Sequence, residues 1–218
     1  MRDVWYILFG YLSGSILYAR IFGELIAHRD ITKQTKDKNP GTANAFMQGG
    51  FWCGVLTLAG DLLKGFVPVY FYLLHLTGRP GIALAFVVAA PVAGHIFPLL
   101  YVLQLLRHRA AEAFQGGKGI AVSFGTLLGL FGRFGLRPAL LLAFSFLFFS
   151  GIVRVTPHYY RTLWTYINTG ILMHFQHFRI DDRNIRIGFL LITAMVVCHL
   201  CRSTEEKEAM QVRILWQQ

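Results

Sequence analysis

Residues 82–106 read IALAFVVAAPVAGHIFPLLYVLQLL and contain no aspartate, glutamate, lysine or arginine. A helix needs about 20 mostly apolar residues to cross the hydrocarbon core of a bilayer, and this stretch is long enough. It therefore predicts a membrane-spanning helix. Because proline lacks an amide hydrogen and clashes with the preceding turn, Pro91 and Pro98 predict a kink in this helix.

Comparable apolar stretches recur through the 218 residues, which are 55% hydrophobic and 15% charged. Soluble domains carry about 25% charged residues, so lipid is the simpler solvent for this chain. Seven stretches are candidate spans: 4–26, 50–76, 82–106, 120–131, 138–153, 163–178 and 185–201. We expect an all-α, polytopic integral membrane protein with about seven transmembrane helices. Residues 1–202 would form one transmembrane domain, and residues 203–218 a short cytoplasmic tail.

The formal net charge of +10 resides in short segments between the apolar stretches. That distribution is typical of loops that flank a membrane, and it argues against a nucleic-acid partner. Lys and Arg are more frequent in the loops after the first, third and fifth spans and in the tail, which places those segments in the cytoplasm and the amino terminus outside. The arginine-rich loop at 179–186 would lie outside in this topology, where few basic residues are expected, so it argues against the placement of the last two spans. The tail itself predicts either a short amphipathic helix or a frayed end.

The three cysteines, Cys53, Cys198 and Cys201, all lie in apolar stretches, so no disulfide framework is expected. Cys198 and Cys201 have the spacing of a redox or zinc half-site, but a structural zinc site needs four ligands and the chain has no second pair. We interpret them as small residues of a membrane helix and expect no metal.

Residues 115–125, QGGKGIAVSFG, place a glycine cluster and Lys118 directly before an apolar run. Backbone amides of Gly116, Gly117 and Gly119 could approach a phosphate closely, and the amino end of the next helix would add partial positive charge. The first glycine of the P-loop pattern is absent. The stretch predicts an anion site, with a flexible loop and a snorkelling lysine as the alternative.

Residues 36–46, KDKNPGTANAF, gather turn-forming and hydrogen-bonding side chains. Asn39, Gly41, Thr42 and Asn44 could turn amide groups toward an anion. The alternative is a polar loop that only joins two helices, since such loops require the same residue types.

Three further ionisable residues lie within apolar stretches. Asp61 and Lys64 are three positions apart and share one helix face, where an ion pair that orients helices is as plausible as direct chemistry. His95 is either a packing residue or part of a site.

In order and spacing, these segments resemble the bacterial acyl-phosphate glycerol-3-phosphate acyltransferase family called PlsY. The resemblance rests on Gly14-Ser15, on the segments NPGTAN, DLLKG, GHIFP and GGKGIA, and on their intervals, and it covers roughly residues 10–125. It implies a seven-helix enzyme of the bacterial cytoplasmic membrane. The enzyme would transfer a fatty acyl group from acyl phosphate to the 1-hydroxyl of glycerol 3-phosphate, giving lysophosphatidic acid in phospholipid biosynthesis.

Acyl phosphate carries a good leaving group, so the reaction needs positioning and electrostatic stabilisation and no cofactor or metal. The resemblance implies catalytic roles for His95, Lys118 and Asn44, and a tentative role for His199. It also implies a set of substrate-binding residues: Asn39, Gly41, Thr42, Gly116, Gly117, Gly119 and Lys38. Glycerol 3-phosphate, fatty acyl phosphate and the bilayer are the expected partners, while the chain length of the donor and the oligomeric state stay open.

The chain departs from the family's first motif. Asp37 replaces a serine, Lys38 a glycine and Met47 an arginine, and the serine and arginine are phosphate ligands in the family. Of the third motif, only His199 remains. A non-catalytic membrane paralogue that binds an anion or lipid, and a small membrane transporter, are therefore alternative functions.

Overall fold

The computed structural model describes residues 1–33, 39–107, 115–202 and 209–215, and most of them are helical. The helices are α1 (Arg2–Gly14), α2 (Tyr18–Ala27), α3 (Thr42–Leu74), α4 (Ala83–Ile96), α5 (Leu99–Leu106), α6 (Ile120–Leu128), α7 (Phe131–Phe134), α8 (Arg137–Leu147), α9 (His158–Leu172) and α10 (Arg183–Arg202). A π-helical turn, η2 (Phe148–Ile152), continues α8. Strands β1 (Val153–Thr156) and β2 (Gln211–Ile214) complete the described elements.

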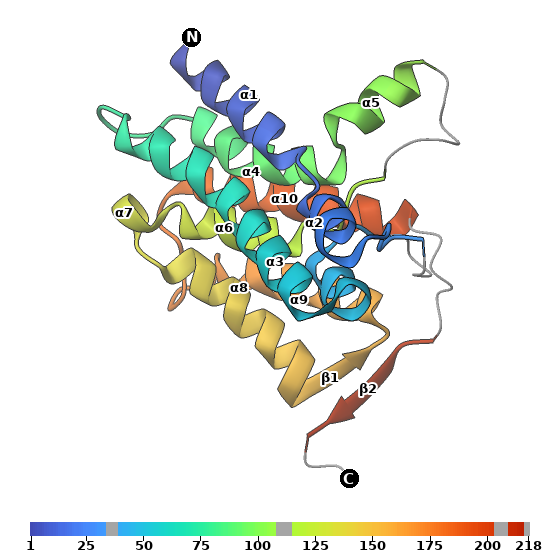
Figure 1. Ribbon diagram of the computed structural model, residues 1–218. Helices are drawn as coiled ribbons and strands as arrows, with labels where there is room; N and C mark the ends of the chain where they lie inside the picture. Colours follow the sequence, from blue (N-terminus) through green and yellow to red (C-terminus); the bar gives the residue numbers. More distant parts are fainter. Residues whose placement is uncertain (34–38, 108–114, 203–208, 216–218) are drawn as a thin grey trace.

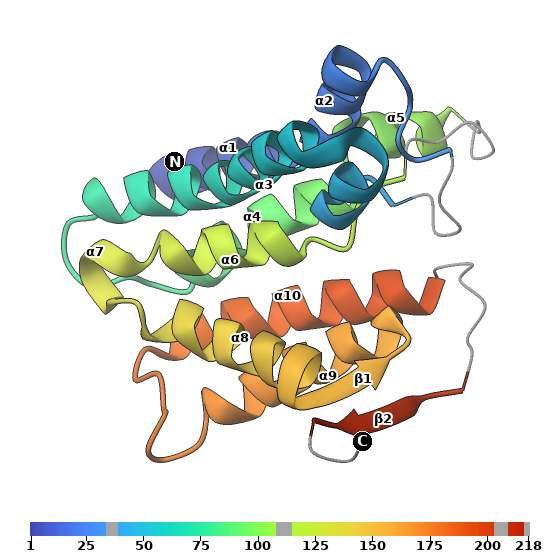
Figure 2. The same ribbon diagram turned by 60° about the horizontal axis from the view of Figure 1, so that its bottom comes forward.

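The long helices run side by side in two layers (Figure 2). One layer holds α1, α3, α4 and α6, and the other holds α8, α9 and α10, with α10 packed against α4. The amino ends of α3, α6 and α9 lie at the same end of the bundle as the carboxyl ends of α4 and α10 (Figures 1 and 2). Chain direction therefore brings the glycine loop before α6 to the same end as His95.

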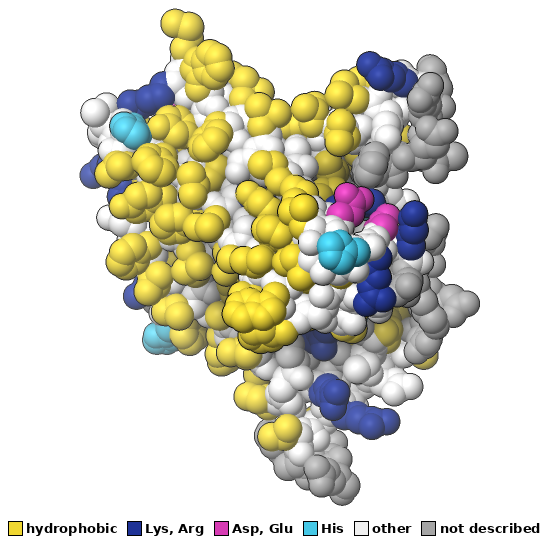
Figure 3. All heavy atoms as spheres, viewed as in Figure 1, with side chains coloured by type: hydrophobic (Ala, Val, Ile, Leu, Met, Phe, Trp, Pro, Cys, Tyr) yellow, Lys and Arg dark blue, Asp and Glu magenta, His cyan; other side chains and the backbone are white. Residues whose placement is uncertain are grey.

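Hydrophobic side chains cover much of the outer surface, over α1, α3 and α8 (Figure 3). Exposed large residues include Trp5, Trp52 and Leu140. Charged side chains gather on the side of α2 and α5 in the same view. This surface has the character of a protein that is solvated by lipid around its middle.

Within the described residues, three helical segments are long and apolar enough to cross a membrane: Arg2–Ala27, Thr42–Leu74 and Arg183–Arg202. A fourth is present if α4 and α5, which are bent by 64° at Phe97 and Pro98, count as one span. The segment Arg137–Ile152 is apolar but shorter. Pro98 accordingly marks the expected kink, whereas Pro91 lies inside α4 without a break.

The first apolar stretch is not one continuous helix, contrary to expectation. It is interrupted between Gly14 and Tyr18, where the backbone of Ile16 and Leu17 is non-helical. The break leaves the Ile16 carbonyl outside the helical hydrogen-bond ladder, and this oxygen accepts a hydrogen bond from Lys64 at 2.6 Å. The break in the first stretch therefore supplies a hydrogen-bond acceptor for Lys64 of α3.

Helices α3 and α6 approach closely because glycines stand at their contact. A Cβ atom on Gly125 would lie 2.1 Å from the Leu62 carbonyl oxygen, and one on Gly65 would lie 2.5 Å from the Val122 carbonyl oxygen. Small residues allow this close backbone packing between membrane helices. The contact fixes Asp61 and Lys64 beside the amino half of α6.

The carboxyl-terminal segment contains a strand, so the expectation of an amphipathic helix is wrong for Gln211–Ile214. This strand, β2, pairs antiparallel with β1, with Val155 opposite Val212 and Arg154 opposite Arg213. The alternation of Val153, Val155 and Val212 supports an extended conformation. β1 directly precedes α9, whereas β2 follows α10 in the chain, and the paired strands lie at the end of the bundle where α9 begins.

The loop after α2 is held by Asp30. Its carboxylate accepts hydrogen bonds from the Thr32 amide at 2.9 Å and the Thr32 hydroxyl at 2.6 Å, and it pairs with Arg20 at 3.6 Å. Partial burial opposes ionisation of Asp30, but Thr32, Arg20 and Lys33 together hold its pKa below the ordinary value.

Candidate active site

A cavity of about 300 Å³ opens at the end of the bundle where α3, α6 and α9 begin and α4 ends. Its polar wall is formed by Asn39, Thr42, Asp61, His95, Lys118 and His158. Its apolar wall is formed by Phe46, Leu58, Ile120, Phe124 and Phe146. The lining thus offers contacts for both a charged group and a hydrocarbon chain.

The Lys64 ammonium organises the buried part of the site. It lies 2.8 Å from Asp61 Oδ1, 2.6 Å from the Ile16 carbonyl oxygen and 2.8 Å from His95 Nδ1. The three groups match the three N–H donors of an ammonium. Asp61 also accepts a hydrogen bond from the Thr42 hydroxyl at 3.3 Å. The pair at 61 and 64 therefore connects α1, α3 and α4.

This contact fixes the protonation of His95. An ammonium has no lone pair, so it can only donate to His95 Nδ1, which must be the unprotonated nitrogen of the ring. The proton of a neutral imidazole then lies on Nε2. His95 is almost fully buried and lines the cavity, so its Nε2–H group can donate a hydrogen bond to an oxygen of a bound molecule.

The glycine loop folds against the end of α4. The Gly117 amide donates to the His95 carbonyl oxygen at 3.1 Å, and a Cβ atom on Gly117 would lie 2.4 Å from His95 Nε2. Gly119 has a φ of 76°, a conformation open to glycine, and it begins α6. Lys118 is buried and lines the cavity with Gly119. The structure therefore brings His95, Lys118 and the amino end of α6 together, as the resemblance implies.

A chain of buried hydroxyl groups supports this loop. The Tyr166 hydroxyl donates to Ser123 Oγ at 2.8 Å, and Ser123 Oγ donates to the Gly119 carbonyl oxygen at 2.8 Å. Tyr166 and Ser123 are fully buried, and the Tyr166 ring stacks on Phe189 of α10. The second layer of helices thereby fixes the position at which α6 begins.

The first polar loop contributes Asn39, Gly41 and Thr42 to the cavity wall. Asn44 is buried and its Nδ2 donates to the Asn39 carbonyl oxygen at 2.8 Å, so this side chain shapes the loop. The catalytic role that the resemblance implies for Asn44 stays a prediction. Met47 is 67% exposed. Lys38 and Asp37 lie outside the described residues.

Two histidines reach this end of the molecule from the second layer. His199 lies in the last turn of α10, half-buried and near enough to His95 to interact with it electrostatically. His158 lines the cavity from the first turn of α9. His158 was missed in the sequence, because nothing in the segment TPHYY indicates that the start of α9 lies against a cavity whose other lining residues fall between positions 39 and 146.

The described residues contain no group of three or more His, Cys, Asp or Glu side chains that could hold a metal ion. Cys198 and Cys201 are free thiols on exposed positions of α10. The cavity instead gathers donors for an anion: one ammonium, one imidazole N–H and the amides at the start of a helix. Such a set can hold a phosphate and stabilise negative charge that develops in a reaction.

A family model described as glycerol-3-phosphate acyltransferase matches residues 4–207 of this chain. A glycerol-3-phosphate acyltransferase of Burkholderia cenocepacia is 29% identical over 187 residues, which are 78% of this chain and 81% of the relative. One from Burkholderia multivorans is 34% identical over 146 residues, which are 66% of this chain. That alignment spans 62% of the relative, less than two thirds of its length.

Two crystal structures of PlsY, an integral membrane glycerol 3-phosphate acyltransferase, share the fold. The glycerol 3-phosphate form aligns with a TM-score of 0.71 and the lysophosphatidic acid form with 0.67. Both are 22% identical to this chain, and the alignments cover 91% of this chain and 88% of the other.

Proposed function

The chain belongs to the glycerol-3-phosphate acyltransferase family, and on that premise we propose that it transfers a fatty acyl group from acyl phosphate to glycerol 3-phosphate. The products are lysophosphatidic acid and phosphate. The observation that carries the proposal is the cavity itself, whose lining combines Lys118, His95 and the start of α6 with apolar side chains. A phosphate-bearing substrate with a hydrocarbon tail requires both kinds of surface.

In this mechanism, side chains and backbone amides of the protein bind the two substrates and orient them for reaction. Lys118 and the amide groups at the start of α6 hold a phosphate, and His95 donates through Nε2 to a substrate oxygen. Asp61 and Lys64 keep the His95 ring in the donor tautomer. Acyl phosphate is already activated, so alignment of a hydroxyl with the acyl carbonyl supplies much of the rate enhancement.

We place the site at the cytoplasmic face of a bacterial inner membrane, with the amino terminus outside and the carboxyl terminus inside. The excess of Lys and Arg in the loops at the site's end supports this orientation. It also places the site where water-soluble glycerol 3-phosphate is available. The domain would comprise residues 1–202, and the pairing of β2 with β1 adds Gln211–Ile214 to it.

The test is formation of lysophosphatidic acid by the purified protein in detergent or nanodiscs from palmitoyl phosphate and glycerol 3-phosphate. Lys118→Ala should lower the rate by roughly 100-fold or more, as expected when a donor to developing charge is lost. A matched variant, Lys33→Ala, removes a lysine of the loop after α2 and should leave the rate within about threefold, as expected of a surface substitution. If the wild-type protein binds glycerol 3-phosphate but forms no product, it is a binding paralogue and the proposal fails.

A further inference from the structure

A second cluster of cations lies at the end of the bundle opposite the candidate active site. There the loop after α3, the short helix α7, the start of α8 and the segment between α9 and α10 come together (Figures 1 and 2). They enclose a cavity of about 620 Å³, which is lined by Arg79, Arg133, Arg137 and Arg179 together with Asp181 and Asp182. We propose that this cavity binds the phosphate group of an anionic phospholipid. Such binding is independent of the acyltransferase reaction.

The arginines carry more charge than the neighbouring carboxylates can balance. Four guanidinium groups line the cavity, against the two carboxylates of Asp181 and Asp182. Within the described part of the chain, none of the four forms an ion pair with a carboxylate. Asp182 instead accepts hydrogen bonds from the Asn184 amide at 2.8 Å and the Ile185 amide at 3.1 Å, so it caps α10. Because like charges repel, an anion that enters between these arginines is attracted by all of them.

Hydrogen bonds between distant segments hold the cavity in shape. Arg133 donates to the carbonyl oxygen of Leu76 at 3.2 Å and to that of Gly78, which ties α7 to the loop after α3. Arg137 donates to the Arg179 carbonyl oxygen at 3.4 Å, which ties α8 to the segment before α10. A ligand therefore meets walls that are already ordered, which lowers the entropic cost of binding.

The arginines keep N–H donors for a ligand. A guanidinium has five N–H groups, of which the described contacts use two in Arg133 and one in Arg137. The guanidinium groups of Arg79 and Arg179 make no hydrogen bond to the described residues. A planar guanidinium presents paired donors that match two oxygens of a phosphate. The chemistry of this cavity is therefore that of a phosphate site.

The surroundings favour a phosphate that is attached to hydrocarbon chains. Phe134 and Ile180 line the cavity beside the arginines. Phe131, Leu136 and Leu140 are exposed apolar residues close to them in the chain, and hydrophobic side chains cover α8 on the outer surface (Figure 3). Basic pockets between transmembrane helices bind lipid headgroups in this way. On the proposed orientation this end faces the outer leaflet, where basic residues are otherwise few, and a bound anion accounts for the arginines there.

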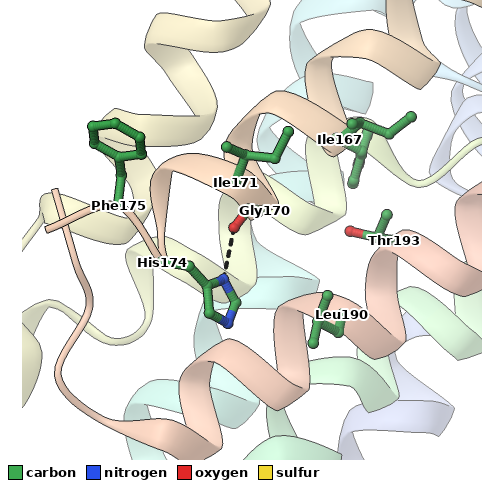
Figure 4. Close-up of a pocket in the computed structure, with 8 residues that line it drawn as sticks. Ile167, Gly170, Ile171, His174, Phe175, Leu190 and Thr193 are labelled. Carbon is green, nitrogen blue, oxygen red and sulfur yellow. Dashed lines mark hydrogen bonds between the residues drawn. The ribbon is translucent and has the colours of Figure 1, made fainter.

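A different cavity, between α9 and α10, lacks this charge. It has a volume of about 530 Å³, and apolar side chains such as Ile171, Phe175 and Leu190 form much of its wall (Figure 4). Among its described lining residues, His174 is the one that can carry a positive charge, and its Nδ1–H donates to the Gly170 carbonyl oxygen at 2.9 Å. Such a surface contacts the hydrocarbon chains of any lipid. Selection by headgroup therefore belongs to the arginine cavity.

The experiment measures binding of radiolabelled phosphatidylglycerol to the purified full-length protein in a non-ionic detergent, by scintillation proximity. Unlabelled phosphatidylglycerol should compete about 10-fold or more better than phosphatidylcholine, because the arginines repel the choline cation. Inorganic phosphate should compete far more weakly than the lipid, since it lacks the hydrocarbon chains. Added salt should weaken binding of the lipid, because it screens exposed charges.

The test variant carries Arg79→Gln together with Arg179→Gln. It removes two charged donors without breaking a described hydrogen bond, and it should weaken phosphatidylglycerol binding by about 10-fold to 100-fold. The double replacement by lysine keeps both charges and should recover part of the affinity. The matched control is Arg183→Gln, at the first residue of α10, which lies at the same end but outside the described lining. It should stay within about threefold of the wild type.

Four results would overturn the proposal. The first is equal competition by phosphatidylglycerol and phosphatidylcholine in the wild type, which decides the matter even if a variant fails to fold. The second is displacement of the lipid by an equal concentration of inorganic phosphate, since the ligand is then a free anion. The third is an equal loss of affinity in Arg183→Gln and the double variant, since surface charge in general is then responsible. The fourth is loss of binding in Lys118→Ala but not in the double variant, since the label then occupies the candidate active site.

Discussion

Replacing Lys64 by methionine tests the buried network most directly. Asp61 and Lys64 are each 2% exposed, and after the substitution the described hydrogen bond that Asp61 retains is the one from the Thr42 hydroxyl. It also removes the donors to Ile16 and His95. Breaking a buried ion pair from one side costs about 3–5 kcal/mol, because a charge stays buried without compensation. That range corresponds to roughly a 100-fold to 4,000-fold change in the unfolding equilibrium.

The assay is equilibrium unfolding in mixed micelles of a mild detergent and SDS, followed by circular dichroism. The control is the double variant Asp61→Asn with Lys64→Met, in which neither charge remains. It should recover most of the lost stability, because a pair replaced on both sides costs far less than a pair broken on one side. If the single variant loses less than about 1 kcal/mol, or if the double variant is no more stable than the single one, the reasoning about the network is refuted.

Three further substitutions test other parts of the structure. Gly125→Ala places a Cβ atom 2.1 Å from a carbonyl oxygen of α3 and should lower the free energy of unfolding by about 1–3 kcal/mol in the same assay. An unchanged unfolding midpoint would contradict the close packing of α3 on α6. Tyr166→Phe removes the buried hydroxyl that donates to Ser123 and should lower the free energy of unfolding by about 1 kcal/mol. It should also raise KM for glycerol 3-phosphate, because the loop before α6 loses a supporting hydrogen bond. Equal KM values for the variant and the wild type would exclude that support. The pKa of Asp30 is lowered in the folded protein, so the ionised carboxylate stabilises the fold at neutral pH, and this stabilisation is lost as pH falls through the carboxyl range near about 4. Asp30→Asn should therefore flatten the acid side of a plot of unfolding free energy against pH. An identical plot for the variant would count against the Asp30 contacts.

The membrane class of the fold follows from the sequence because apolar length is a local property. The stretches at 50–76 and 185–201 correspond to α3 and α10, and the kink at Pro98 follows from proline chemistry. The break at Ile16 could not be predicted, since the exposed carbonyl oxygen finds its hydrogen-bond donor, Lys64, on another helix. The strand β2 was missed for the same reason, because its partner lies more than 50 residues upstream.

The residues of the candidate site likewise include some that the sequence indicated and others that only the packing of helices brings together. Glycines and Lys118 are recognisable in the sequence, since a phosphate loop concentrates its residues in one short segment. The pairing of Lys64 with His95 and the placement of His158 depend on helix packing, and each joins residues 31 or more positions apart in the chain. The hydrogen bond from Asn44 to the Asn39 carbonyl oxygen at 2.8 Å, by contrast, lies within one short loop, and the catalytic role implied for Asn44 stays a prediction.

The pairing of β1 with β2 has a consequence for the order in which this protein is made. A ribosome synthesises β2 after every described helix, yet β2 pairs with the strand that leads directly into the first turn of α9. Until β2 has emerged, β1, the segment directly before His158, has no strand partner. The strand pairing that precedes α9 is therefore completed late in synthesis, after the helices of both layers are already available to enter the bilayer.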